Sequence, residues 1–237
     1  MGTVLKVTLG VIFGGLVLIV GCSALISAGT DEVGQEDTNA DSPRIKVEDS
    51  RLIYEPDQTG GRFHEGFVVV RNPSDKPIQV EGQVSVKDGG QLVESYEPAP
   101  TVILPRSRGV LVESALDLPK PVTHGKLETK LVSTPVNEAD PAPRVKFSKL
   151  RYRPDDIVGC ALSGTVTHNL DEPTEVRVNA IGRRGREIVT GGFTFVDKVF
   201  PRTPATFKID IASPALCPAR VDRIEAFWDP GADGLSG

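Results

Sequence analysis

The feature that most constrains the fold of this chain is an internal repeat. The segment SRLIYEPD at 50–57 recurs as SKLRYRPD at 148–155, displaced by 98 positions. The matched blocks, given as first copy and second copy, are 50–57 and 148–155, 66–77 and 164–173, 104–106 and 200–202, and 127–128 and 224–225. Because the blocks keep their order and nearly their spacing, the sequence predicts two copies of one structural module.

Within each copy the hydrophobic pattern is that of strands. Apolar residues alternate with polar ones, and this period of two indicates strands with one buried face. The alternating sets are Val68 and Val70, Val84 and Val86, Val176 and Val178, and Ile224, Ala226 and Trp228. Hairpin turns are expected at Lys87–Gly90 and Gly182–Gly185, where glycine accepts positive φ. We therefore expect an all-β fold of two tandem immunoglobulin-like β-sandwiches, with Trp228 in a core.

Composition shifts divide the chain further. Three prolines between 135 and 143 predict a stiff linker, and the acidic, weakly apolar stretch before the first copy predicts disorder. The expected divisions are a membrane anchor at 1–30, an acidic disordered stalk at 31–43, a first sandwich module at 44–134, a Pro-rich linker at 135–143, a second sandwich module at 144–230, and a flexible tail at 231–237.

The N-terminal segment predicts contact with a membrane. The 24 residues Val7–Thr30 contain no charge, which is enough for a spanning helix of ~20 residues. Lys6 precedes this run and five carboxylates follow it between positions 31 and 41, so the positive-inside tendency places the remainder of the chain outside the membrane. Alternatively, Ile19–Cys22 resembles a bacterial lipobox, in which Cys22 would be lipid-modified after cleavage of a signal helix. Both interpretations give an extracytoplasmic location.

Short motifs in the two copies resemble a known family. These are an opening strand that ends in Leu-x-Tyr at 52–54, a Gly-x-Val strand running into Asn72, and a strand that runs into Asp88 and Gly89. They resemble the FxLYD-type domains of bacterial membrane-anchored surface proteins. The resemblance covers both copies. It implies a sandwich fold and a location at the bacterial cell membrane, with the bulk of the chain extracytoplasmic, and it implies no particular activity.

Cys160 and Cys217 both fall in the second copy. Outside the cytoplasm, a cysteine pair within one domain is expected to form a disulfide, and we favour this over a redox or metal-binding pair. Arg183, Arg184 and Arg186 cluster at the predicted hairpin tip of the same copy. They are expected to form a solvated turn, and they are also candidates for contact with an anion or a partner.

No catalytic or metal-binding pattern accompanies these features. The three histidines lie apart, and the chain contains no GxSxG elbow, phosphate-binding loop or dinucleotide fingerprint. A net charge of −5 without a dense basic patch excludes a typical nucleic-acid binder. We therefore expect no enzyme, no cofactor and no metal. The favoured function is non-catalytic binding of an envelope protein or polymer by a membrane-anchored protein. The alternative is a structural spacer or an envelope-maintenance lipoprotein.

Overall fold

The computed structural model describes residues 45–54, 63–118, 122, 125–136, 144–155, 159–211 and 216–229. The expected membrane anchor, including Cys22, the acidic stalk, the tail and residues 137–143 of the expected linker lie outside the described residues. Within the described ranges, no helix has the length and apolar character needed to cross a bilayer. We refer to residues 45–136 as the N-terminal half and to residues 144–229 as the C-terminal half.

The described elements are all β-strands, which confirms the predicted all-β class. The strands are β1 (Lys46–Tyr54), β2 (Phe63–Arg71), β3 (Ile78–Asp88), β4 (Gln91–Tyr96), β5 (Thr101–Ile103), β6 (Arg108–Asp117), β7 (Gly125–Pro135), β8 (Val145–Asp155), β9 (Gly159–His168), β10 (Thr174–Arg184), β11 (Glu187–Val199), β12 (Ala205–Ile211) and β13 (Arg223–Asp229). Gly89 and Gly90 form the turn between β3 and β4, as the sequence predicts, and both have positive φ. The corresponding turn between β10 and β11 is made by Gly185 and Arg186, whereas Gly182–Arg184, which the sequence places in this turn, belong to β10.

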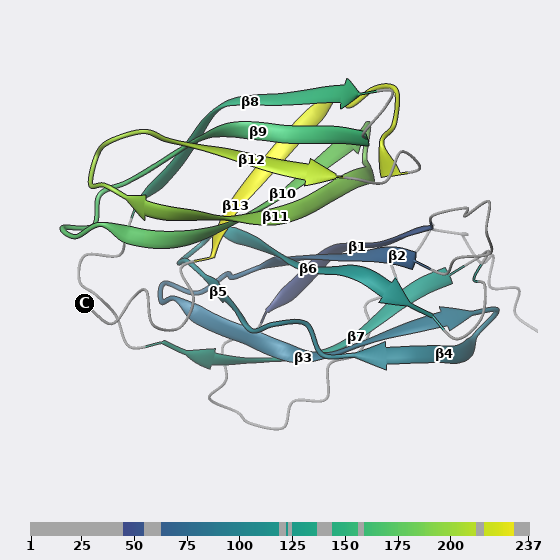
Figure 1. Cartoon of the computed structure of the whole chain (residues 1–237). Coiled ribbons are helices and arrows are strands. Elements are labelled where there is room, and N and C mark those ends of the chain that lie inside the picture. Colours follow the sequence, from purple (N-terminus) through teal and green to yellow (C-terminus); the bar gives the residue numbers. More distant parts are fainter. Residues whose placement is uncertain are drawn as a thin grey trace, which may run out of the picture. The chain divides into compact units, whose positions relative to one another are not determined.

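The strands form four antiparallel sheets, two in each half (Figure 1). In the N-terminal half one sheet has the order β1-β2-β6, and in the other β3 is flanked by β4 and β5 on one edge and by β7 on the other. In the C-terminal half the orders are β12-β9-β8 and β11-β10-β13. The sheet β1-β2-β6 thus corresponds to β8-β9-β12, and the strands β4-β3-β7 correspond to β11-β10-β13. The two halves therefore have the same strand order in both of their sheets.

A turn with an unusual backbone recurs in the two halves. Arg106 and Arg202, which occupy equivalent places in the repeat, have positive φ values of 52° and 59°. In each turn a backbone amide then bonds three residues back, from Ser107 to Leu104 at 3.2 Å and from Thr203 to Phe200 at 3.1 Å. A left-handed conformation is uncommon for a residue other than glycine, so its recurrence at matched positions is a specific similarity.

Each half has an apolar core between its own two sheets. In the N-terminal half Val68, Val70, Val80 and Val84 are buried in one cluster. In the C-terminal half the core includes Leu162, Val166, Val176, Val178 and Trp228. These are the alternating positions along the strands, and their burial confirms the predicted period of two.

A further apolar cluster joins the two halves. Its members come from β2 and β6 on one side and from β10, β11 and β13 on the other, namely Phe67, Val69, Val110, Val112, Ile181, Ile188 and Phe227. The sheet β1-β2-β6 thus packs its outer face against the sheet β11-β10-β13, a contact that we call the central contact. Because β2 and β6 are covered on both faces, they are apolar at successive positions, as is typical of strands buried on both sides.

Candidate functional site

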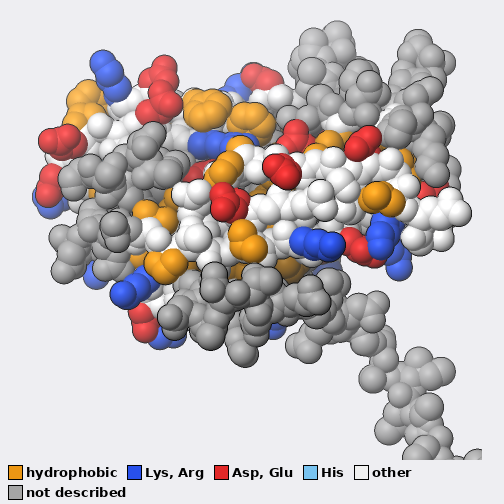
Figure 2. All heavy atoms as spheres, turned by 90° about the horizontal axis from the view of Figure 1, so that it is seen from below, with side chains coloured by type: hydrophobic (Ala, Val, Ile, Leu, Met, Phe, Trp, Pro, Cys, Tyr) orange, Lys and Arg blue, Asp and Glu red, His pale blue; other side chains and the backbone are white. Residues whose placement is uncertain are grey.

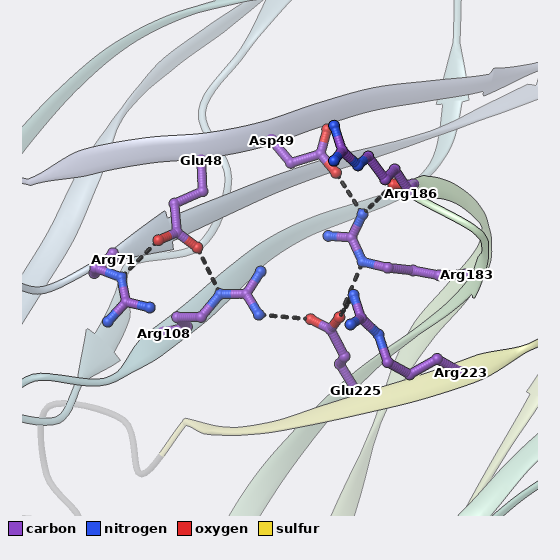
Figure 3. A network of polar contacts seen from close by, with 8 residues as sticks. All are labelled: Glu48, Asp49, Arg71, Arg108, Arg183, Arg186, Arg223 and Glu225. Atoms are coloured by element: carbon purple, nitrogen blue, oxygen red, sulfur yellow. Dashed lines mark hydrogen bonds and ion pairs between the residues drawn. The ribbon is translucent and has the colours of Figure 1, made fainter.

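A polar network borders the central contact (Figure 3). It begins at a β-bulge in β1, where the register shifts between Val47 and Asp49. The bulge interrupts the alternation of side chains, so that Glu48 and Asp49, although adjacent, both bind arginines of the network. Glu48 accepts from Arg71 at 2.5 Å and pairs with Arg108 at 2.6 Å.

Arg183 is the buried cation of this network, and only 4% of its side chain is exposed. Its Nη1 donates to Asp49 Oδ2 at 2.5 Å and to the backbone oxygen of Arg186 at 2.6 Å, while its Nε donates to Glu225 Oε1 at 3.1 Å. The expectation that Arg183 lies at a solvated hairpin tip is therefore wrong. On β10, Arg183 alternates with Ile181, so its side chain leaves the sheet on the face that meets the N-terminal half. Arg184 and Arg186 are exposed.

Glu225 gathers three arginines. In addition to Arg183, its carboxylate pairs with Arg108 at 2.9 Å and with Arg223 at 2.5 Å. Arg108 and Arg183 come from different halves, so this carboxylate links them. Such a network has strict geometric requirements, because each desolvated charge needs its partners in place. It is suited to holding the halves in one orientation, and it contains no pairing of nucleophile and base.

The pKa of the Glu48 carboxyl reflects this environment. Burial raises the pKa, but the hydrogen bond from Arg71 and the charge of Arg108 lower it by more, so the net shift is downward. The carboxylate thus remains charged at neutral pH. Its ion pairs with Arg71 and Arg108 therefore persist at neutral pH.

A disulfide fastens the C-terminal half. Cys160 on β9 and Cys217, just before β13, are bonded with their Cα atoms 5.5 Å apart, which confirms the predicted pair. Beside it, the Tyr152 hydroxyl of β8 donates to the backbone oxygen of Pro218 at 2.5 Å. The segment that leads into β13 is thus attached to both β8 and β9.

An open groove lies on this flank of the C-terminal half. It has a volume of about 440 Å³ and runs between β8 and the segment that enters β13. Its lining residues are Leu150, Tyr152, Pro154, Ala219, Arg220, Val221, Asp222, Arg223 and Ile224. Both β8 and β13 are edge strands of their sheets, so the groove is bordered by two strand edges. The sequence carries one signal for it, since Leu150, Tyr152 and Pro154 alternate on one strand.

A second exposed feature lies on β11. Phe193 and Phe195 meet edge to face with ring centroids 5.9 Å apart, and the guanidinium of Arg177 lies 4.3 Å from the centre of the Phe193 ring. Phe195 is 58% exposed, whereas Phe193 packs against the central contact. This pair is an apolar rim of that contact.

The remaining sequence candidates have structural roles where they are described. His168 Nε2 lies 2.7 Å from the backbone oxygen of Val199, and its Nδ1 accepts from the Leu170 amide at 3.2 Å. The His168 ring also stacks on buried Trp228. Across the ranges that the structure describes, no group of three or more His, Cys, Asp or Glu residues could hold a metal ion.

The face formed by β3, β4 and β7 is a solvated surface. Figure 2, which views the molecule from that side, shows acidic and basic side chains interspersed with isolated hydrophobic ones. Lys87 and Glu128 pair across this face at 2.5 Å. A mixed surface of this kind does not by itself indicate a binding site.

The chain matches no protein-family model and no curated protein sequence. Among solved structures it is similar to a β-glucuronidase from Ruminococcus gnavus in complex with D-glucuronic acid, with 10% identity and a TM-score of 0.18 over 73% of this chain. The chain spans 46% of the length of that enzyme.

This match contradicts one expectation from the sequence. The matched protein is an enzyme, so we withdraw the expectation that the present chain is not one. A TM-score of 0.18 nevertheless carries no argument about the fold of this chain or about any reaction.

Proposed function

We propose that this protein is a membrane-anchored, extracytoplasmic interaction protein of the bacterial envelope. In this proposal two tandem immunoglobulin-like sandwiches present one fixed surface to a partner. The observation that carries the proposal is the open groove between β8 and β13 in the C-terminal half.

The strand orders of the sheets and the sequence repeat support the proposal of two tandem sandwiches. The order β1-β2-β6 corresponds to β8-β9-β12, and β4-β3-β7 corresponds to β11-β10-β13. The recurrent turn at Arg106 and Arg202 falls between corresponding strands. Two packed antiparallel sheets with alternating inner faces are the general plan of an immunoglobulin-like sandwich.

The membrane location rests on the N-terminal sequence. A run of 24 uncharged residues, with a lysine before it and carboxylates after it, suits either a retained helix or a lipoprotein signal. Palmitate labelling of the wild type and of Cys22→Ser distinguishes the two. Labelling that disappears in the variant supports lipidation, and absence of label from both, with the protein in the membrane fraction, supports a retained helix.

The groove is the best candidate for a binding site because it combines apolar and charged side chains and is held in place. The disulfide and the Tyr152 hydroxyl fix the segment that forms one wall. A preformed site loses less conformational entropy on binding than one that must become ordered.

One observation favours the spacer as a second candidate. The central contact and its arginine network link the two halves through both apolar packing and ion pairs. A pair of sandwiches held in this way would act as a stiff extension. A spacer has no need of the groove, so the two candidates differ in what a substitution in the groove should do.

The test is a pulldown from envelope extracts with the purified full chain as bait. We expect a partner to be recovered by the wild type and by Thr206→Trp, which alters an exposed position on β12. Ala219→Trp fills the groove from an exposed position and should abolish recovery. Failure of every bait to recover a partner would favour the spacer, and equal recovery by all three would remove the groove from the proposal.

A further inference from the structure

The groove can be assigned a kind of partner, and this inference rests on the proposed function. We propose that the groove binds an extended, acidic segment of a partner protein, whose backbone pairs with the open edge of β13. Three properties of the described residues point to this ligand. They are an unoccupied strand edge, an apolar floor of strand-like spacing, and an excess of arginine around the opening.

The first property is the strand edge. Among the strands that the structure describes, β13 pairs with β10 alone, since the order of its sheet is β11-β10-β13. The far end of β13 lies against the N-terminal half, where Asp229 Oδ1 accepts from the amide of Val102 at 3.1 Å. The near end, which begins at Arg223, borders the groove. An exposed strand edge is a template for a further strand, and such pairing is a common way to bind peptides.

The second property is the floor of the groove. Leu150, Tyr152 and Pro154 lie on β8 at every second position, and Val221 and Ile224 face them from the segment that enters β13. A strand added to β13 would present every second side chain to this floor. The spacing of the apolar contacts therefore suits an extended ligand better than a helical one, whose contacts recur every three or four residues.

The third property is charge. Among the residues that line the groove, Arg220 and Arg223 are basic and Asp222 is the one acidic side chain. Arg223 pairs with Glu225 at 2.5 Å. Asp222 is already engaged, since it pairs with Arg220 at 2.6 Å and accepts from the Gly185 amide at 3.1 Å. The side chains of Arg220 and Arg223 are 80% and 61% exposed. A ligand with carboxylates beside its apolar residues would match this surface, whereas a basic ligand would be repelled.

The experiment uses the full chain in detergent and a synthetic eight-residue peptide that alternates valine and glutamate. Isothermal titration calorimetry should detect binding of this peptide. A version with lysine in place of glutamate tests charge, and a version with alternate backbone amides N-methylated tests strand pairing, because methylation removes the donors. Both altered peptides should bind about tenfold more weakly or not at all, a loss of about 1.4 kcal/mol or more.

Matched variants of the protein locate the site. Arg220→Glu reverses an exposed charge at the groove and should weaken binding of the acidic peptide about tenfold, or about 1.4 kcal/mol. Lys208→Glu reverses an exposed charge on β12, in the same half but away from the groove lining, and should leave binding unchanged. Thermal unfolding of both variants checks that they remain folded.

Several outcomes would overturn the inference. Equal binding of the N-methylated peptide would exclude pairing with β13, and unchanged binding by Arg220→Glu would exclude the charged rim. A marked gain in peptide affinity on neutralising the carboxylates of residues 31–41 would identify that acidic segment of the chain as the occupant instead. If a partner recovered by pulldown is neither displaced by the acidic peptide nor lost with Arg220→Glu, the proposed function stands and this inference fails.

Discussion

The two halves differ most in the side chains on the outer faces of their corresponding strands, that is, on the faces that point away from each half's own core. On β2 of the N-terminal half, Phe67 and Val69 point into the central contact and are fully buried. At the matched positions of β9 in the C-terminal half stand Thr165 and Thr167, which are partly exposed. Their hydroxyls bond within their own sheet, with Thr165 Oγ1 lying 2.7 Å from Ser148 Oγ.

The same difference holds for the other strands of these faces. Val110 and Val112 of β6 are buried in the central contact, whereas their counterparts on β12, Thr206 and Lys208, are exposed. On the opposite side of the contact Ile181 is buried. Its counterpart Ser85 on β3 faces outward, where its hydroxyl meets Ser95 at 2.8 Å.

This difference shows why the packing of one half against the next stops after two copies. The central contact joins unlike faces of the two halves, and a contact of this kind can in principle be repeated by further copies. The outer faces that would continue it carry threonine, lysine and serine in place of phenylalanine, valine and isoleucine. Polar outer faces of this kind keep a stack soluble and finite, as terminal repeats do in repeat proteins.

Among the substitutions that test this difference between the faces, Phe67→Ala should have the largest effect on the free energy of unfolding. Removing a large, fully buried side chain from the central contact should lower the free energy of unfolding by about 3–5 kcal/mol. Thr165→Ala, at the matched outer position, should change it by less than about 0.5 kcal/mol. Urea unfolding followed by the fluorescence of Trp228 measures both. Similar losses in the two variants would refute the assignment of the inner and outer faces.

The disulfide gives the next contrast, since it belongs to the C-terminal half alone. The paired substitution of Cys160 and Cys217 by alanine should destabilise that half by about 2–4 kcal/mol, because the bond closes a loop with a sequence separation of 57. Hydrogen exchange should report lower amide protection in β9 and β13 and unchanged protection in β3 and β7. Equal loss in all four strands would indicate that the halves unfold as one unit.

The arginine network should contribute less to the free energy of unfolding than the disulfide does. Arg183→Met removes the buried cation that Asp49 and Glu225 share, and we expect a loss of about 2 kcal/mol. The loss is smaller than for an isolated buried pair, since Glu225 retains Arg108 and Arg223. Arg184→Met, at the exposed neighbouring position, should have almost no effect on urea unfolding. A larger loss for Arg184→Met would contradict the observed burial.

The smallest effect is a pH dependence at the rim of the central contact. Burial raises the pKa of the Glu113 carboxyl, and the charge of Arg177 offsets this only in part. A carboxyl whose pKa is higher in the folded than in the unfolded state binds its proton more tightly when folded, so stability declines as pH rises from the unfolded pKa through the folded one. Glu113→Gln should therefore gain in Tm relative to the wild type between about pH 4 and pH 7. Parallel Tm curves for the two proteins would contradict the shift.

Part of the candidate site could be predicted from the sequence. The cysteine pair was predictable because two cysteines in one module that is expected to lie outside the cytoplasm have few other uses. The central contact also left a signal, since Phe67–Val70 and Val110–Val112 are unbroken apolar runs where one-sided strands would alternate. Gly191 left another, because a Cβ there would lie 2.6 Å from Cε1 of Phe67, and the sequence shows only a glycine within a strand.

The position of Arg183 was not predictable. Three arginines in a hairpin segment normally suggest a solvated tip, and the burial of one of them depends on carboxylates that are more than 40 positions away. The groove is similar, because its walls come from two edge strands separated by most of the C-terminal half. Its charge could be read from the sequence only after those two segments were known to be neighbours.

The sequence by itself determined the strands, their one-sided cores, the turns and the disulfide. These follow from local pattern and from residue types, because a period of two and a glycine turn act over a few residues. Only the tertiary structure decided which outer face is covered, which arginine is buried and which strand edges remain open. Those outcomes depend on which surfaces meet, and surfaces are formed by residues far apart along the chain.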